Sequence, residues 1–298
     1  MVEAQETLRR VAAEWRPETE TVRERIAAGP SIALAGVFDC DAPVRDDGDA
    51  LPPLWHWLHF LERSAQSELG EDGHPVRGTL LPDYPRRRRM FAGGRLTVHA
   101  PLRVGAEVAR TSRVTAATYK EGRSGPMLFV TAEYRFTEGD DLLCVEEQDI
   151  VYRQDPEPAP APSAPPPAPA ASASGAGEGT GPAPDWRWEL TPGPALLFRF
   201  SALTYNTHRI HYDHPYVTGV EGFPGLVVHG PLTALALLEL PRRAREGVRE
   251  FSFRARRPLF AGEHITYAGH RDGTHATLTA GTPATPQAVT AEAHLTNA

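Results

Sequence analysis

The segment TYNTHRIHYDHP, residues 204–215, gathers the side chains of this sequence that are best suited to chemistry. It places His208, His211 and His214 within seven residues, with Asn206 and Asp213 beside them. Histidines at this density suit three tasks: binding a metal ion, exchanging protons with a substrate, or forming hydrogen bonds in a polar loop. The surrounding sequence decides which of these tasks is favoured.

A metal site is the least favoured of the three. His208 and His211 are three residues apart, and Asp213 or His214 would add a third ligand. An HExxH helix is absent, however, and no cysteine or distant carboxylate obviously completes a site. We therefore expect no metal ion at this segment.

An acid/base site fits the position of the segment better. The polar stretch 198–229 leads directly into residues 230–246, GPLTALALLELPRRARE, whose apolar residues follow helical spacing on most sides. A helix of this kind is normally buried, so the polar loop brings titratable groups against an apolar wall, where pKa values shift. The alternative of solvated or backbone-bound histidines stays open for each ring, and His214, which precedes a proline, is interpreted as structural.

Two parts of the sequence share one strand pattern. Residues 93–114 and 251–270 each contain an alternating strand, then Pro-Leu-x-x-Gly, then a second alternating strand. Further strands are predicted around a turn in residues 125–153 and in residues 275–281 and 287–297. The matching order predicts an internal duplication.

The helices that these strands would cover are fewer. Residues 230–246 form the clearest helix, and residues 51–66, LPPLWHWLHFLERSAQ, are the best candidate for its counterpart in the first unit. We therefore predict an α+β fold in which an antiparallel sheet wraps one long helix, twice over.

A Pro/Ala/Gly-rich segment separates the two units. Residues 154–185 hold ten of the 29 prolines and no large apolar residue to bury before Trp186. Such a composition cannot offset the entropy of folding by burial, so we predict a disordered linker. The predicted units are an N-terminal domain, residues 1–153, and a C-terminal catalytic domain, residues 186–298.

Composition excludes several classes of function. The net charge of −7 and the lack of an extended basic face argue against a nucleic-acid partner. The charged N-terminus has no apolar core of a signal peptide, and no stretch is long and apolar enough to span a membrane. Two cysteines give no disulfide framework. We expect a cytoplasmic protein without a membrane partner.

The order of these residues resembles the hydratase motif of the MaoC-like hot-dog family. That motif reads Ser-Gly-Asp-x-Asn-Pro-x-His-x-Asp and is followed by Phe-x-x-x-Ile-x-His-Gly; here TYNTHRIHYD and FPGLVVHG occupy those places. Four further stretches resemble the branch of mesaconyl-C4-CoA hydratases and fungal-type 3-hydroxyacyl-thioester dehydratases. They are PPLWHWLHF at 52–60, GGRL at 93–96, GRSGP at 122–126 and EEQDIVYR at 146–153.

This resemblance implies a double hot dog fold and a hydro-lyase. The reaction would interconvert an enoyl thioester and a 3-hydroxyacyl thioester, carried by coenzyme A or an acyl carrier protein, with no further cofactor. His211 matches the catalytic histidine, and a backbone N–H at Gly230, at the start of the buried helix, would face the thioester oxygen. Substrate contacts are expected at four residues: Thr204, Tyr205, His208 and His229. A monomeric double hot dog and a homodimer are both compatible with two units in one chain.

Asn206 departs from the broad family, which has an acidic residue at this position. An amide cannot abstract a proton, so Asn206 is expected to orient the water or hydroxyl while His211 transfers the proton, alone or with another group. The named branch has the same Asn and His208 variant. An acyl-thioesterase and a non-catalytic thioester-binding or assembly subunit are the alternative functions. The arginines Arg86–Arg89 form either a solvated loop or a contact to coenzyme A phosphates.

Overall fold

The computed structural model describes residues 2–76, 78, 80, 82, 87–122, 125–154 and 183–296. The N-terminal half contains α1 (Val2–Glu14), β1 (Glu20–Arg25), α2 (Ala28–Val37), two short 3-10 helices (Trp55–Leu58 and Gln66–Glu68), β2 (Arg87–Val98), β3 (Glu107–Gly122), β4 (Gly125–Glu138) and β5 (Asp141–Gln154). The C-terminal half contains β6 (Trp186–Leu190), α3 (Pro194–Leu203), a 3-10 turn (Arg209–His211), α4 (His214–Gly219), α5 (Gly230–Arg243), β7 (Val248–Ala255), β8 (Ile265–Asp272), β9 (His275–Thr282) and β10 (Thr285–Leu295). The predicted linker, residues 154–185, lies outside the described residues except at its two ends.

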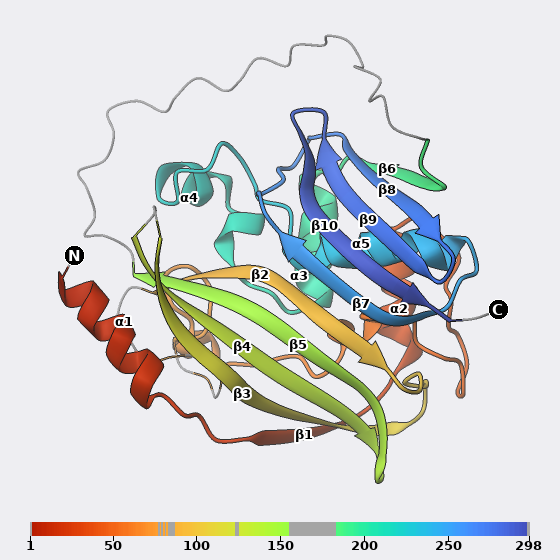
Figure 1. Cartoon of the computed structure of the whole chain (residues 1–298), viewed down its shortest axis with the longest axis horizontal. Helices are drawn as coiled ribbons and strands as arrows, with labels where there is room; N and C mark the ends of the chain where they lie inside the picture. The colour runs from red at the N-terminus through yellow and green to blue at the C-terminus, as the bar shows by residue number, and fades with distance from the viewer. Residues whose placement is uncertain are drawn as a thin grey trace.

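The strands of both halves form one continuous antiparallel sheet (Figure 1). Its order is β1-β3-β4-β5-β2-β7-β10-β9-β8-β6. The halves meet where β2 pairs with β7, from Gly93 opposite Arg254 to Thr97 opposite Glu250. The sequence predicts one antiparallel sheet for each half, and the pairing of β2 with β7 joins these two sheets edge to edge.

The predicted duplication is visible in the order of the strands. From the central pair outward, the N-terminal half runs β2, β5, β4, β3 and the C-terminal half runs β7, β10, β9, β8. Both Pro-Leu-x-x-Gly segments follow the central strand of their half, and their glycines, Gly105 and Gly262, have φ angles of 86° and 85°. These positive φ values explain why both repeats need glycine at this position.

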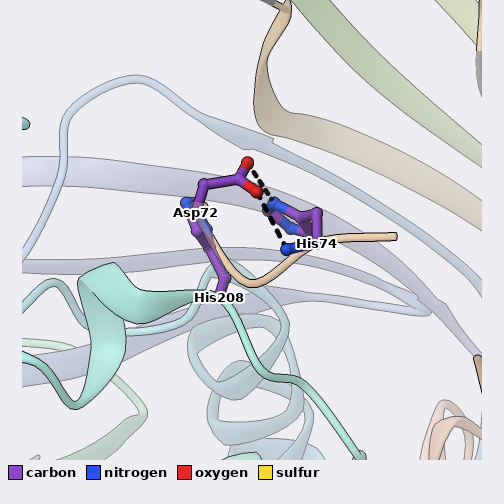
Figure 2. Close-up of side chains that lie close together, drawn as sticks. All are labelled: Asp72, His74 and His208. Carbon is purple, nitrogen blue, oxygen red and sulfur yellow. Dashed lines mark hydrogen bonds and ion pairs between the residues drawn. The ribbon is translucent and has the colours of Figure 1, made fainter. Parts of the chain in front are cut away.

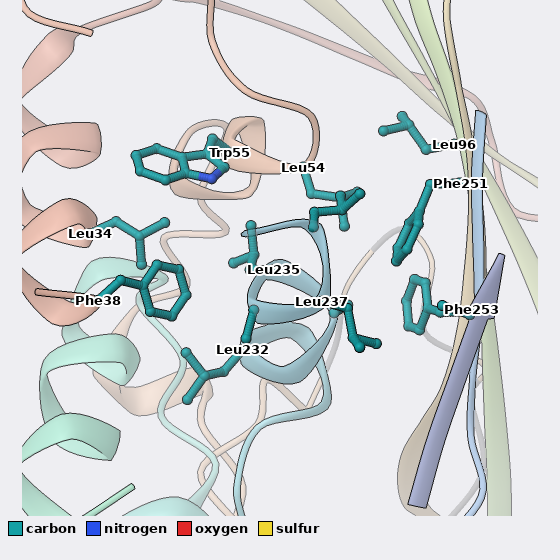
Figure 3. Close-up of a cluster of buried hydrophobic side chains, with 14 of the residues drawn as sticks. Leu34, Phe38, Leu54, Trp55, Leu96, Leu232, Leu235, Leu237, Phe251 and Phe253 are labelled. Atoms are coloured by element: carbon teal, nitrogen blue, oxygen red, sulfur yellow. The ribbon is translucent and has the colours of Figure 1, made fainter. Parts of the chain in front are cut away.

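The core is built around α5, which begins at Gly230 as predicted and is buried nearly all round. Figure 3 shows its leucines packed between residues of α2 and the Trp55 turn on one side and the sheet phenylalanines Phe251 and Phe253 on the other. The buried Glu239 is paired within the helix with Arg242, whose Nε donates at 2.6 Å. The core cluster contains residues of both halves, so α5 and the sheet hold the halves together.

The predicted helix at residues 51–66 is wrong. This segment forms only the 3-10 helix Trp55–Leu58, and a second 3-10 helix, Gln66–Glu68, begins at its last residue. Leu54 and Phe60 have φ angles of 67° and 53°, which interrupt an α-helix, and Pro52-Pro53 precedes them. The N-terminal half therefore has no counterpart of α5 among its described residues. In the described part of the chain, the helices are all too short or too polar to cross a membrane.

Candidate active site

A cavity of about 1170 Å³ has walls from both halves of the chain. The C-terminal half contributes residues 204–208, 210 and 211 and the start of α5, and the N-terminal half contributes residues of β2–β5 and of the segments 56–64 and 74–75. A volume of this size suits a large organic ligand. The sequence-predicted residues that line the cavity are Thr204, Tyr205, Asn206, His208, His211 and Gly230.

The loop that carries the histidines is fixed by its own polar side chains. Tyr205, with a φ angle of 51°, turns the chain sharply at the end of α3. The Asn206 Oδ1 then accepts a hydrogen bond from the His208 N–H at 3.0 Å. Asp213 caps α4 by accepting from the Tyr216 N–H at 3.1 Å, and its other oxygen pairs with Arg209. His208 and His211 are therefore held on a short, rigid turn.

His211 lies against the cavity wall with its ring in a defined orientation. Its Nδ1 is 2.7 Å from the carbonyl oxygen of Val227. Because a carbonyl only accepts, Nδ1 carries the proton and Nε2 carries the lone pair. Val227 also donates its N–H to the carbonyl of Ile210 at 3.0 Å, which locks the two segments together. Burial lowers the pKa of His211 to about 4, against the effect of the Val227 carbonyl, so the ring is a neutral base near pH 7.

His229 packs against the ring of His211 and does not line the cavity. Its ring is fully buried and stacks on that of His211, with centroids 3.7 Å apart. The Nε2 of His229 is 2.8 Å from the hydroxyl oxygen of Ser201 in α3. Burial also lowers its pKa well below the usual range. His229 is not among the residues that line the cavity, and its contact with substrate stays a prediction.

His208 meets two residues from the N-terminal half that the sequence analysis missed. Its ring centroid is 4.0 Å from that of His74, and His74 Nδ1 is 3.0 Å from Asp72 Oδ2 (Figure 2). Burial, and then the charge of His74, lower the pKa of His208 far below the usual value. Asp72 and His74 stand in the stretch EDGHP, but nothing in its spacing points to the distant histidine loop. Only the fold brings the two stretches together.

The same three residues form the candidate metal-binding group found within the described ranges. One ligand atom from each of Asp72, His74 and His208 lies within 4.8 Å of the others. The histidine loop supplies no second set of ligands: His211 Nδ1 is bound to Val227, and Asp213 caps α4 and pairs with Arg209. The imidazole rings of His74 and His208 are tilted against each other at an interplanar angle of 41°.

The segment that carries Asp72 and His74 docks on the histidine loop through backbone contacts. The Arg209 N–H donates to the Asp72 carbonyl at 2.9 Å, and the Thr207 hydroxyl donates to the Gly73 carbonyl. Gly73 has a φ angle of 87°, and a Cβ at this position would lie 1.9 Å from the Thr207 carbonyl oxygen. Glycine is therefore required at this contact.

The first turn of α5 faces the same cavity. Gly230 begins the helix after His229, and both Gly230 and Pro231 line the cavity. N–H groups of a first turn have no partner inside the helix and sit at the positive end of its dipole. A Cβ on Gly230 would lie 3.1 Å from Phe91 Cδ1, so glycine leaves room here. The position suits an acceptor that gains negative charge.

The far wall of the cavity carries buried polar groups of the N-terminal half. Glu146 accepts from Trp57 Nε1 at 2.8 Å and pairs with His56 Nε2 at 2.7 Å. Close to the same wall, the Oγ of Ser112 and the Nε2 of His59 are buried without a hydrogen-bond partner among the described residues. Buried polar atoms without a partner are costly unless a ligand or water satisfies them.

The arginine run lies in a strand rather than in a solvated loop, as far as it is described. Arg87 begins β2, whereas Arg86 lies outside the described residues. Arg88 is paired with Glu221, and Arg89 lines the cavity. The exposed side chains of Arg256 and Arg257 line the cavity as well.

Comparison with known proteins places this arrangement in a family. Residues 54–261 match the family hydroxyacyl-thioester dehydratase type 2. The chain is 42% identical to mesaconyl-C(4)-CoA hydratase of Chloroflexus aurantiacus, over 83% of this chain and 84% of that protein. This chain belongs to the hydroxyacyl-thioester dehydratase type 2 family. It is also 26% identical to the mitochondrial hydroxyacyl-thioester dehydratase type 2 of Schizosaccharomyces pombe, over 72% of this chain and 76% of that protein.

Solved structures agree on the fold. A MaoC-like dehydratase from Phytophthora capsici matches with a TM-score of 0.64 at 14% identity, covering 98% of this chain and 99% of that one. A Mycobacterium tuberculosis protein described as having a double hotdog fold matches with a TM-score of 0.57 at 15% identity, covering 96% and 97%. The predicted double hot dog fold is confirmed. Membership of the dehydratase family confirms the predicted enzyme class, a hydro-lyase.

Proposed function

We propose that this chain interconverts an enoyl thioester and a 3-hydroxyacyl thioester by adding or removing water. The observation that carries this proposal is the orientation of His211. Its Nδ1 proton is held by the Val227 carbonyl at 2.7 Å, so its basic Nε2 is available at the cavity beside the first turn of α5. A base next to a group that stabilises an oxyanion is what proton abstraction beside a thioester carbonyl requires.

The proposed roles follow from where each group lies. In the dehydration direction, His211 Nε2 takes the proton from Cα while negative charge develops on the thioester oxygen. The Gly230 N–H, at the start of α5, stabilises that charge. Asn206 lines the cavity and orients the hydroxyl on Cβ, whose loss completes the double bond. Hydration is the reverse sequence. This is acid/base chemistry of side chains, so we propose no resident cofactor beyond the coenzyme A or phosphopantetheine of the substrate.

We propose that the acyl group carries a polar end, as that of mesaconyl-C(4)-CoA does. Two observations support this. The first is the 42% identity to a mesaconyl-C(4)-CoA hydratase. The second is the far wall, where Ser112 Oγ is buried without a hydrogen-bond partner among the described residues and Arg110 is a cavity-lining cation. These groups would satisfy a carboxylate, whereas a purely aliphatic chain would leave them without partners.

We propose that the thiol carrier enters past arginines that line the cavity. Arg89, Arg256 and Arg257 all line it, and the last two are exposed. Guanidinium groups pair well with the phosphates that coenzyme A and phosphopantetheine both carry. Thr204 and Tyr205 flank this access, and Tyr205 is 54% exposed. The two free cysteines are consistent with the proposed cytoplasmic location. Sedimentation of the purified chain would separate a monomer from a homodimer.

A panel of enoyl thioesters tests the proposal. Purified protein is mixed with crotonyl-CoA, mesaconyl-C(4)-CoA and a longer aliphatic enoyl-CoA, and loss of the conjugated-thioester absorbance is followed. We expect hydration, fastest with the acyl group that carries a carboxylate. Release of free thiol without hydration would identify a thioesterase instead. Binding without turnover of any member would identify a non-catalytic subunit.

A further inference from the structure

Two of the stretches that resemble the mesaconyl-C4-CoA hydratase branch meet at one wall of the cavity. Residues 52–60 supply Trp57 and residues 146–153 supply Glu146, and both side chains line the cavity. The two residues are 89 positions apart in the sequence, yet Trp57 Nε1 donates to Glu146 Oε1 at 2.8 Å. The proposed proton transfer uses neither residue, so it does not explain this contact.

The carboxylate of Glu146 is buried and surrounded by polar partners. Its side chain is 3% exposed. Oε1 also accepts from Gln148 Nε2 at 2.7 Å, and Oε2 lies 2.7 Å from His56 Nε2. A buried carboxylate is costly even with such partners, and an apolar side chain would fill the same space without that cost. A glutamate here therefore favours a role in orienting the groups around it, among them the indole of Trp57.

The backbone around Trp57 takes a conformation that its residues do not prefer. Leu54 and Phe60, on either side of the turn, have φ angles of 67° and 53°. Bulky side chains adopt this region only where their surroundings enforce it. The Phe60 N–H donates to Glu24 Oε2 at 2.9 Å, and its carbonyl accepts from Arg110 Nη1 at 2.8 Å. Tertiary contacts therefore fix the position of this turn.

The indole of Trp57 lies between Glu146 and the start of α5. It meets the rings of Phe91 and Phe253 edge-on, with centroids 6.1 and 6.4 Å apart. Phe91 lines the cavity, and its Cδ1 is 3.1 Å from the position that a Cβ on Gly230 would take. Trp57 is therefore one aromatic ring away from the helix start that faces the thioester oxygen in the proposed reaction. An acyl chain that extends from there toward this wall meets the indole.

Gly94 gives the aromatic cluster its space. It belongs to a third stretch that resembles the same branch, residues 93–96. A Cβ on Gly94 would lie 3.1 Å from Phe253 Cε1 and 2.8 Å from the carbonyl oxygen of Glu147. Glycine at this position lets Phe253 pack closely on β2 and against Trp57. Three separate stretches of the sequence thus support one indole at the cavity.

We propose that Trp57 is a specificity-determining residue of the acyl pocket and that Glu146 positions it. This inference rests on the proposed function. The fixed indole limits the space open to the acyl group beyond the reacting carbons, so short enoyl groups are preferred over long aliphatic ones. A pocket wall that discriminates by a single methylene changes kcat/KM by roughly 10- to 200-fold.

The ratio of kcat/KM for crotonyl-CoA to that for trans-2-octenoyl-CoA tests the role of Trp57. Both acyl groups are aliphatic, so the ratio reports size and not charge. We expect Trp57→Phe, which opens the wall and removes the Nε1 donor, to lower the ratio at least about 10-fold. Trp55→Phe is the matched control, because Trp55 is 1% exposed, belongs to the core and does not line the cavity. It should keep the wild-type ratio.

Two variants of Glu146 test whether it positions the indole. Glu146→Gln keeps an acceptor for Trp57 Nε1 and should keep a ratio close to that of the wild type. Glu146→Leu removes the acceptor and should lower the ratio as Trp57→Phe does. If Glu146→Leu does not fold, the indole N–H resonance of Trp57, identified by its absence from Trp57→Phe, decides instead. This resonance should move more in Glu146→Gln than the other indole resonances do.

Binding of saturated thioesters separates this proposal from the proposed function. Butyryl-CoA and octanoyl-CoA have no double bond to hydrate, so their dissociation constants report on the pocket alone. A wild type that hydrates no enoyl thioester, with a Trp57→Phe variant whose preference shifts at least ~10-fold toward octanoyl-CoA, would overturn the function and leave the pocket role standing.

The opposite outcomes overturn the pocket role. If the wild type hydrates enoyl thioesters and Trp57→Phe keeps the wild-type ratio, or Trp55→Phe changes it equally, Trp57 does not determine specificity and the function stands. If Glu146→Leu folds and keeps the wild-type ratio, or the Trp57 indole resonance is unmoved in Glu146→Gln, Glu146 does not position the indole. A wild type that neither hydrates nor binds these thioesters would overturn both proposals.

Discussion

At the scale of single residues, the proposed mechanism depends most on His211. Replacing it with alanine would remove the proposed base, and we predict a loss of at least ~100-fold in kcat for enoyl-thioester hydration. His214 provides the matched control, since it lies three residues away, is exposed, and starts α4 outside the cavity. His214→Ala should keep near-wild-type turnover, measured by the same absorbance. Equal turnover in both variants would remove His211 from the mechanism.

The burial of His211 also predicts how stability depends on pH. Its pKa is about 4 in the folded chain and about 6.5 when unfolded, so the unfolded state binds the proton first as pH falls. Stability should therefore decrease from pH 6.5 toward pH 4, by about 3 kcal/mol from this residue alone. His208 and His229 act in the same direction.

Urea unfolding at pH 7 and pH 5 measures this effect. In His211→Gln the stability lost between these two pH values should be about 2 kcal/mol smaller than in the wild type. His214→Gln, at an exposed position, should lose as much as the wild type. If His211→Gln and the wild type lose equal stability, the ring is not held neutral by burial.

The residue scale also shows what the sequence could predict. One stretch of the sequence contains Asn206, His211 and Gly230, and both the order of these residues and the helix that follows can be recognised from the sequence alone. The structure places all three residues at the cavity. His229 occupies the predicted position in the chain but lies behind His211, because stacking of the two rings depends on how the loop folds back. Asp72 and His74 were unpredictable: their link to His208 arises from contacts between segments more than 130 residues apart, such as that of Thr207 with Gly73.

At the scale of elements, the segment around Gly73 holds the two halves of the site in register. Gly73→Ala would strain a positive φ angle and bring Cβ against the Thr207 carbonyl, so the segment must move away from the histidine loop. We predict a loss of stability beyond the ~1–2 kcal/mol of the φ strain alone, and a decrease in kcat of about 100-fold from misplaced groups.

Gly48→Ala is the control for this change. Gly48 has a φ angle of 94° and nothing within 4 Å of its Cβ position, so it tests strain without collision. Chemical denaturation and kcat of the two variants should differ clearly. Equal kcat values would mean that docking of residues 72–74 does not position the chemistry.

Elements were predicted best where local pattern and fold agree. The strands on both sides of each Pro-Leu-x-x-Gly segment and the start of α5 at Gly230 lie where the sequence predicts them. The helix expected at residues 51–66 fails because Leu54 and Phe60 take positive φ angles that an apolar pattern does not reveal. The pairing of β2 with β7, which merges the sheets, was equally hidden, since strand patterns do not specify partners.

At the scale of the whole molecule, the two halves form one catalytic unit. The sheet is continuous through β2 and β7, one core cluster contains residues of both halves, and the cavity has walls from both. The sequence separately predicts that residues 154–185 serve as a linker without a packed core. If both statements hold, the covalent connection through residues 155–182 is dispensable once the chain has folded.

A protease site introduced in residues 155–182 tests this consequence. We predict that the cleaved protein elutes as one species in gel filtration, shows two fragments on a denaturing gel, and keeps kcat within about twofold. The reason is that the pairing of β2 with β7 and the shared core keep water out of the contact surface between the two halves. A second site in the β3–β4 hairpin between Gly122 and Gly125 is the control for cleavage at a strand connection within one half. Separation of the fragments after cutting at 155–182, with loss of turnover, would show that the halves depend on the linker to stay paired and that the sheet junction alone does not hold the active site together.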